Sequence, residues 1–377
     1  MKLYKWLTII AFAIVFSLVI YIVFNYIYTD EPELQLVTVV FRHGDRMPHT
    51  SAGEGYVNNP NAENNYFPIG QGGLTNDGKL REYNLGQFLR EKYNNFLDST
   101  FTPEVLEARS TNYERTILSL QLVLAGLYPP NNDQVWNPSL NWQPIPTYYE
   151  PETKDILLST ILCSRFQEQR AKIMQIPEVK EKFESFADLL KNLTTLVGRP
   201  ITTTFDVAKI YFTILTEYES NFTIPNWASR YLYNQHVINA IKFDYEIAVY
   251  NNIMKKLTAG PLIRKMSEDM ISVRNGSFTN GRKIFLYSGH ESNLVTLLSS
   301  FGVYHFHVPK FSSAVIVEFY RLKEEYYVQV VYYLGIPPEI EIKEIPGCSK
   351  LCPLHKFLEL MKPVTPNEDE VNSQCDL

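Results

Sequence analysis

Two short apolar runs constrain the fold of this chain more than any other feature. Residues 34–41 read LQLVTVVF and residues 284–287 read IFLY, and each run leads into a polar turn that contains a histidine, His43 or His290. Apolar, β-branched runs without polar alternation are typical of strands buried on both faces of a parallel sheet. We therefore expect both segments to be strands in the interior of the protein.

The segments around these runs predict alternating strands and helices. Thr75 is placed to cap a helix with apolar residues at helical spacing up to Leu89. Residues 105–130 suggest a short strand, a turn at residues 109–112 and a second helix that stops at Pro129 and Pro130. The later runs SSAVIVEFY and EYYVQVVYYL predict antiparallel strands. Together these patterns indicate an α/β fold.

The middle third of the chain has a different pattern. Helical periodicity dominates residues 154–257, with polar breaks near Gly198 and Asn221. We expect a helical cap inserted into a discontinuous α/β catalytic domain, which would comprise residues 31–153 and 258–377. A chain of 377 residues with 45% hydrophobic residues has enough apolar material for such a two-part core.

The first 30 residues predict a membrane-targeting segment. Lys2 and Lys5 precede an uncharged run over residues 6–24, which as a helix would span about 28 Å, close to the hydrocarbon thickness of a bilayer. No small residues suited to signal cleavage follow Phe24, so an uncleaved signal anchor is favoured over a cleaved signal peptide. The flanking lysines place the catalytic body in the lumen or outside the cell, and cleavage would make it secreted or lysosomal.

The net charge limits the function. The chain has 35 Lys and Arg against 41 Asp and Glu, a formal charge of −6, which argues against a general nucleic-acid binder. Phosphate chemistry must therefore depend on local arginines. Arg42 and Arg46 flank His43, and Arg109 lies in the predicted turn of another strand-helix unit.

Clustered arginines around one imidazole are best explained by a bound dianion. Guanidinium groups match phosphate oxygens bidentately, and their charge keeps the histidine neutral and nucleophilic. In open α/β sheets the site lies beyond the carboxyl ends of the strands, where the turns at His43 and His290 would meet. Glu291 is the candidate acid for protonating a leaving group.

Cysteines and glycosylation signals fit the secretory pathway. The four cysteines (Cys163, Cys348, Cys352 and Cys375) allow three pairings, and a zinc site at Cys348, Cys352 and His355 is the weaker alternative. A metal at His305 and His307 is weaker still, because no carboxylate partner is evident. N-x-S/T sites occur at Asn192, Asn221 and Asn275.

The heptapeptide RHGDRMP resembles the histidine acid phosphatase family, the branch that contains prostatic and lysosomal acid phosphatases and phytases. The resemblance covers residues 34–375. Further similar segments follow in the order GLTNDGKLREYNLGQFLREKY, ARSTNYERTILSLQLVLAGLYPP, WNPSLNWQPIP, CSRFQE, NFTIPNWA, YSGHESN and PGCSKLCPLHKFLEL. The family implies a phosphoglycerate mutase-like three-layer α/β/α sandwich with a smaller helical cap.

The resemblance also implies roles for individual residues. His43 would form a phosphohistidine, the phosphoryl oxygens would be held by Arg42, Arg46, Arg109 and His290, and the acid after His290 would protonate the leaving group of a phosphomonoester or phosphopeptide. No metal or other cofactor is implied. The implied disulfides join Cys163 to Cys375 and Cys348 to Cys352, and family members often form homodimers.

One departure from the family pattern leaves alternatives open. The usual His-Asp pair is His290-Glu291 here, and the additional methylene moves the carboxyl by about 1 Å, a shift that can cost as much as ~10²-fold in rate. The leading hypothesis is an acid phosphatase. The alternatives are a catalytically weakened phosphate-ester-binding relative and an inositol-phosphate phosphatase.

Overall fold

The computed structural model describes residues 14, 16–17, 31–62, 66–278 and 281–373. The predicted membrane segment at residues 6–24 lies outside these residues apart from Ile14, Phe16 and Ser17. Within the described part of the chain, no helix has both the length and the apolar character needed to cross a bilayer.

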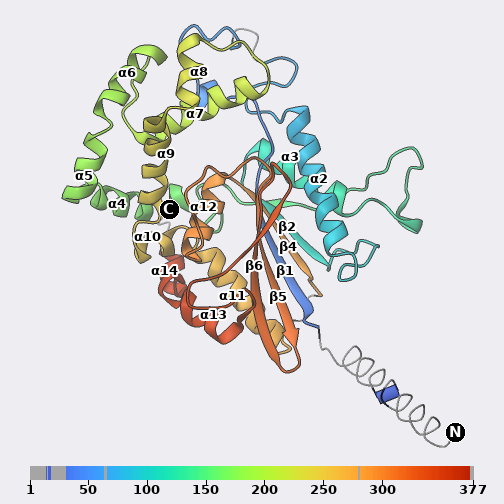
Figure 1. The fold of residues 1–377 in the computed structure, drawn as a ribbon. Helices are drawn as coiled ribbons and strands as arrows, with labels where there is room; N and C mark the ends of the chain where they lie inside the picture. The colour runs from blue at the N-terminus through green and yellow to red at the C-terminus, as the bar shows by residue number, and fades with distance from the viewer. Residues whose placement is uncertain (1–13, 15, 18–30, 63–65, 279–280, 374–377) are drawn as a thin grey trace, which may run out of the picture.

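A mixed eight-stranded sheet forms the centre of the molecule (Figure 1). Its order is β3-β2-β4-β1-β5-β6-β7, and β8 pairs with β6. The strands are β1 (Glu33–Arg42), β2 (Leu106–Ser110), β3 (Tyr148–Tyr149), β4 (Ile284–Gly289), β5 (Ala314–Leu322), β6 (Glu325–Tyr333), β7 (Ile340–Lys343) and β8 (Cys352–Pro353). β1, β2, β3 and β4 run parallel, whereas β5 to β8 are antiparallel to their neighbours. The predicted apolar strands and the antiparallel pair are confirmed.

Helices cover both faces of this sheet. Residues of β1 alternate between two cores, so that Val37, Val39 and Phe41 pack against one layer of helices and Leu36 and Val40 against the other. The first layer is α2 (Asn76–Lys92) and α3 (Glu114–Leu127), and the second is α11 (Gly260–Arg274), α12 (Glu291–Ser300) and α13 (Leu354–Met361). The expected α/β fold is therefore confirmed.

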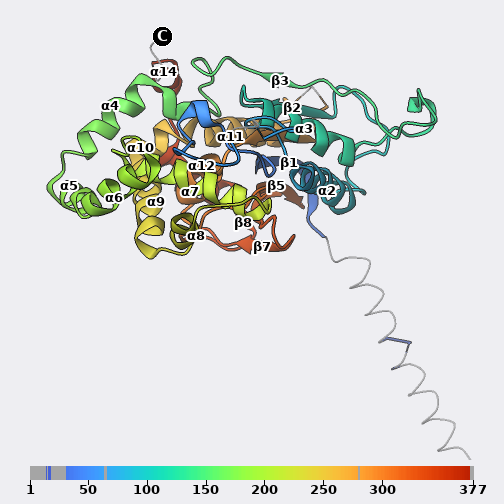
Figure 2. The same ribbon diagram turned by 90° about the horizontal axis from the view of Figure 1, so that it is seen from above.

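The expected helical insertion is also present and has its own hydrophobic core. Its helices gather on one side of the sheet in both views (Figures 1 and 2). They are η3 (Thr160–Leu162), α4 (Ser164–Ile173), α5 (Pro177–Glu184), α6 (Ala187–Val197), α7 (Thr204–Glu219), α8 (Asn226–Leu232), α9 (Gln235–Ala248) and α10 (Asn252–Leu257). The domain boundaries at residues 154 and 257 stay predictions.

Local signals place α2 against the first histidine turn. Thr75 caps the helix as predicted, because its side chain accepts a hydrogen bond of 3.0 Å from the backbone N–H of Gly78. A Cβ at position 78 would clash with the carbonyl oxygen of Asp45, so this close approach requires glycine. The remaining short elements are η1 (Thr50–Ala52), η2 (Asn132–Gln134), η4 (Lys362–Val364) and α14 (Glu368–Asn372).

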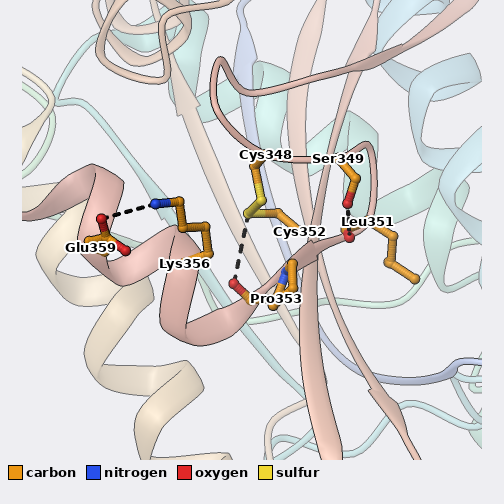
Figure 3. Close-up of a disulfide and its surroundings, with 7 residues drawn as sticks. All are labelled: Cys348, Ser349, Leu351, Cys352, Pro353, Lys356 and Glu359. Atoms are coloured by element: carbon orange, nitrogen blue, oxygen red, sulfur yellow. Dashed lines mark hydrogen bonds and ion pairs between the residues drawn. A yellow bond between two sulfur atoms is a disulfide. The ribbon is translucent and has the colours of Figure 1, made fainter.

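The implied disulfide between Cys348 and Cys352 is present, with Cα atoms 5.6 Å apart (Figure 3). Because it uses both thiols, the zinc alternative at these cysteines is excluded. Cys375 lies outside the described residues, so its pairing with Cys163 stays a prediction. Asn192, Asn221 and Asn275 are all exposed, as glycosylation would require, but glycosylation at these sites remains a prediction.

Candidate active site

The ends of three parallel strands bring the predicted turns together. In the register of the sheet, Arg42 at the end of β1 lies beside Gly289 of β4, and Ser110 of β2 lies beside Ser288. The backbone N–H of His43 donates to the Gly289 carbonyl over 3.0 Å. His43, His290 and the residues after β2 therefore meet at one edge of the sheet, as the position of sites in α/β folds predicts.

His43 is buried and held in one tautomer. It is 2% exposed, and its Nδ1 lies 2.8 Å from the carbonyl oxygen of Gly44. A carbonyl can only accept a hydrogen bond, so Nδ1 carries the proton and Nε2 keeps a free electron pair. The His290 ring lies edge-on with its centroid 5.5 Å away, and His290 Nε2 shares a 3.1 Å hydrogen bond with the Thr111 hydroxyl.

Burial and positive charge keep both imidazoles neutral. Burial, reinforced by the guanidinium charges of Arg115, Arg42 and Arg46, lowers the pKa of His43 well below its usual value. Burial and the same three arginines also lower the pKa of His290. A neutral His43 is the form that can act as a nucleophile.

Arg42 is fixed by contacts from two segments, the loop at residues 309–311 and the beginning of α12. Its Nη1 donates to the Pro309 carbonyl over 2.5 Å, and its guanidinium lies 3.9 Å from the centroid of the Phe311 ring. Its Nε lies 3.5 Å from Glu291 Oε2. Glu291 is the first residue of α12, so its carboxylate is placed at the site by the helix that follows His290.

Arg46 is oriented by a carboxylate that the sequence analysis did not identify. Its Nη1 and Nη2 donate to the two oxygens of Glu54 over 2.6 and 2.7 Å, and Nη1 also donates to the Met47 carbonyl. Glu54 belongs to a loop rich in Gly and Asn without helical or strand periodicity. No sequence signal therefore linked it to Arg46.

Arg109 differs from its expected setting, and the structure corrects the predicted turn. It lies within β2, where it pairs with Tyr287 in register, and not in a turn. Its Nη2 donates to the buried Asp155 over 2.6 Å, an ion pair that offsets its charge. Its role as a phosphate ligand stays a prediction.

Arg115 lies where Arg109 was expected. It occupies the first turn of α3, and its charge acts on both His43 and His290. Burial and repulsion by Arg46 lower the pKa of Arg115 to about 9, so it stays charged in acid and at neutral pH. Both arginines lie in the family-like segment RSTNYERT at residues 109–116, which we call the signature. Two general rules could have favoured the second arginine. Side chains alternate between the two faces of a sheet along a strand, and a helix that follows a strand begins at the sheet edge that carries the site.

The three arginines around His43 have unused donors. The Nε groups of Arg42, Arg46 and Arg115 are buried and make no hydrogen bond within the described residues, although that of Arg42 lies 3.5 Å from Glu291 Oε2. The Nε groups of Arg109 on the neighbouring strand and of Arg90 on α2 also lack a hydrogen bond. Buried N–H groups normally donate a hydrogen bond, and leaving one without an acceptor costs about 1–3 kcal/mol. Three such groups around one neutral imidazole indicate an anion-binding site.

The side chains considered as metal ligands have other partners. His307 Nε2 lies 2.7 Å from the Tyr332 hydroxyl, and its Nδ1 lies 2.7 Å from the His305 carbonyl. Over the described ranges, no three His, Cys, Asp or Glu side chains are grouped as ligands for a metal ion.

Comparisons with known proteins show the family to which this chain belongs. Residues 33–333 match the model of the histidine phosphatase superfamily (branch 2). The chain is 41% identical to a venom acid phosphatase of Apis mellifera, over 90% of this chain and 88% of the relative, and 34% identical to a prostatic acid phosphatase of Bos taurus, over 88% and 85%. Among solved structures, the apo form of a Hafnia alvei phytase superposes with a TM-score of 0.63 at 15% identity, covering 89% and 97%.

The likeness to the phytase supports the fold alone. The identities to the acid phosphatases, together with the family match over most of the chain, support more. This chain belongs to the histidine phosphatase superfamily (branch 2) and is an acid phosphatase, a phosphoric monoester hydrolase.

Proposed function

We propose that this acid phosphatase works through a covalent phosphohistidine on His43. The observation that carries the proposal is the set of three unused guanidinium Nε donors around a neutral imidazole whose Nε2 is free. A phosphoryl group placed there would supply acceptors for the three donors. It would also present its phosphorus atom to the nucleophile.

The first step transfers the phosphoryl group to the enzyme. The electron pair on His43 Nε2 attacks phosphorus, the bond between phosphorus and the ester oxygen breaks, and Glu291 in its acid form gives its proton to the leaving oxygen. In the second step a water molecule attacks the phosphohistidine, and the Glu291 carboxylate takes a proton from that water. The P–N bond then breaks and inorganic phosphate leaves.

Arg42, Arg46 and Arg115 stabilise the charge on the phosphoryl oxygens during both steps. Preorganised donors aimed at developing charge are typically the largest catalytic contribution, and arginines can serve where other phosphoryl-transfer enzymes use Mg²⁺. We assign the third position to Arg115 and not Arg109, because the charge of Arg115 acts on both His43 and His290, whereas Arg109 is paired with Asp155 and is not among the charges that act on either histidine. His290 completes the pocket, oriented by Thr111.

Glu291 is the proposed acid and base although the family pattern has aspartate. Its position next to Arg42, 3.5 Å from the guanidinium, places a carboxyl group at the edge of the pocket.

We also infer that the protein passes through the secretory pathway. The disulfide between Cys348 and Cys352 requires an oxidising compartment for its formation, and relatives carry the names venom and lysosomal acid phosphatase. The exposed glycosylation signals are consistent with this route.

Hydrolysis of an aryl phosphate by wild type and His43→Ala tests the mechanism. We expect the variant to lose activity by about 10⁴-fold or more, because no other group can form the covalent intermediate. Circular dichroism checks that the variant is folded. Retained activity in a folded variant would refute the mechanism, and wild-type binding of phosphate esters without turnover would favour the binding-protein alternative.

A further inference from the structure

Glu54 is a second carboxylate in contact with the arginine cluster, and the proposed mechanism does not use it. We propose that Glu54 is a specificity-determining residue that disfavours polyanionic phosphate esters and so selects monoesters whose leaving group carries no further negative charge. This inference rests on the proposed function, because it assumes that the cluster binds phosphate. The reasons are the position, the anchoring and the charge of Glu54.

The position of Glu54 determines which N–H donors of Arg46 are available to a substrate. Both Nη groups of Arg46 donate to the Glu54 oxygens, so the edge of the guanidinium that remains without an acceptor is Nε. The Glu54 side chain is 12% exposed and that of Arg46 10%. A phosphate at Nε of Arg46 would therefore have a buried negative charge on the other side of the same guanidinium.

The His49 backbone holds the Glu54 carboxylate, and side chains of the insertion hold the backbone of its loop. The backbone N–H of His49 donates to Glu54 Oε2 over 2.7 Å, and the Thr213 hydroxyl on α7 donates to the Glu54 carbonyl over 2.5 Å. Arg199 donates to the carbonyls of Gly53 and Gly55 on either side. Glu54 is thus a preorganised part of the pocket wall, and a bulky anionic substrate cannot displace it at little cost.

The charge of Glu54 persists in acid. Burial alone would raise its pKa, but the Arg46 guanidinium and the hydrogen bond from His49 outweigh burial and lower it. Glu54 therefore offsets one of the positive charges of Arg42, Arg46 and Arg115 before any ligand binds. One phosphoryl group neutralises the remaining positive charge, so the charge of the site does not favour the binding of a second phosphoryl group.

The lining of the small cavity beside the site adds little positive charge. A small cavity beside the site is lined by Asp45, Asp77 and Glu219, and its one lining cation, Arg81, is already paired with Asp45. Of the two cations beside the Glu54 loop, Arg199 is engaged with carbonyls and Lys209 lies against the Phe205 ring. A substrate such as myo-inositol hexakisphosphate would find no unpaired cation in the lining of this cavity for its other phosphates.

The test compares two substrates in three proteins. The ratio of kcat/KM for myo-inositol hexakisphosphate to kcat/KM for p-nitrophenyl phosphate is measured in wild type, Glu54→Gln and Glu219→Gln. Glutamine keeps the size and an acceptor for Arg46 while removing the charge. We expect this ratio to rise about tenfold or more in Glu54→Gln, and to stay within about twofold in Glu219→Gln, which removes an exposed carboxylate from the same neighbourhood.

Two outcomes would overturn the proposal. If turnover of both substrates falls in parallel in Glu54→Gln, the residue only positions Arg46. If Glu219→Gln raises the ratio as much, the effect belongs to the general charge of the surface. Calorimetric binding of inorganic phosphate and of myo-inositol hexasulfate to the same proteins gives a readout without turnover. Failure of wild type to hydrolyse p-nitrophenyl phosphate would instead count against the proposed function.

Discussion

The sheet edge around His43 and the loop that carries Glu54 contribute to the same pocket but are built differently. At the sheet edge, parallel strands fix the register, so residues 43 and 290 meet although they are far apart in the chain. The Glu54 loop is instead held by individual side chains of the insertion, such as Thr213 and Arg199. The chemistry of this enzyme is therefore placed by backbone pairing, and its selectivity by side-chain contacts with the insertion.

Glu217 shows how strongly the second region depends on single side chains. This buried carboxylate on α7 accepts hydrogen bonds from Tyr56 and Tyr66 over 2.8 Å each and from Asn59 over 2.7 Å. These contacts bind Tyr56, Asn59 and Tyr66 to a helix about 150 residues later in the chain. Such an anchor leaves no periodic pattern in the sequence, in contrast to the strands.

The largest expected effect is the difference in activity between alanine variants of Arg115 and Arg109. We expect Arg115→Ala to lower kcat/KM for a monoester by about 10²–10³-fold, as for the loss of one preorganised donor. Arg109→Ala should lower it by less than about tenfold but should reduce the free energy of unfolding by about 1–3 kcal/mol, because Asp155 loses its cationic partner. Steady-state kinetics and denaturant unfolding measure both quantities.

The opposite result for these two variants would change which residues belong to the site. If folded Arg109→Ala loses as much activity as Arg115→Ala, β2 itself contributes to the phosphate pocket and the first arginine of the signature regains its expected role. If neither variant loses activity, two arginines suffice and the cluster is smaller than proposed.

A smaller effect is the pH dependence of the free energy of unfolding, which should arise from the two histidines at the sheet edge. His43 and His290 have lowered pKa values when folded, whereas in the unfolded chain they take up protons below about pH 6.5. As the pH falls below this value, the unfolded state is favoured by up to about 1.4 kcal/mol per pH unit for each histidine. This contribution is absent above the unfolded pKa.

Denaturant unfolding between pH 7.5 and 5 measures this dependence. In His43→Ala the pH dependence of the unfolding free energy should lose about half of the contribution from the two histidines. Saturating inorganic phosphate should restore stability in acid, because the anion binds the folded site. His355→Asn, which removes an exposed histidine, is the matched control and should leave the slope unchanged. An unchanged slope in His43→Ala would show that the sheet edge is not the origin of the effect.

Much of the sheet and its site could be predicted from the sequence. The run at residues 34–41 predicts β1 to within one residue at each end, and Thr75 predicts the beginning of α2, because burial and capping have strong local signals. The meeting of His43 and His290 follows from the rule for strand ends. Arg109 shows the limit of prediction from the sequence. Whether it lies in a strand or in a turn decides which way its side chain points.

The position of Glu54 could not be predicted in the same way. Its partner Arg46 is only eight residues away, but the orientation of the loop depends on α7 and on Arg199, which come about 150 residues later. No hydrophobic periodicity or capping signal encodes such a contact. Specificity, unlike chemistry, therefore required the three-dimensional structure.

Trapping the phosphoenzyme tests the central claim most directly. In Glu291→Gln, p-nitrophenyl phosphate should still transfer its phosphoryl group, because its leaving group needs little protonation, while water attack is slowed by the missing base. Quenching in alkali, where phosphohistidine is stable, followed by mass spectrometry should show close to one phosphoryl group per chain, on His43. Phosphoryl label on another residue, or none during continuing hydrolysis, would contradict the account.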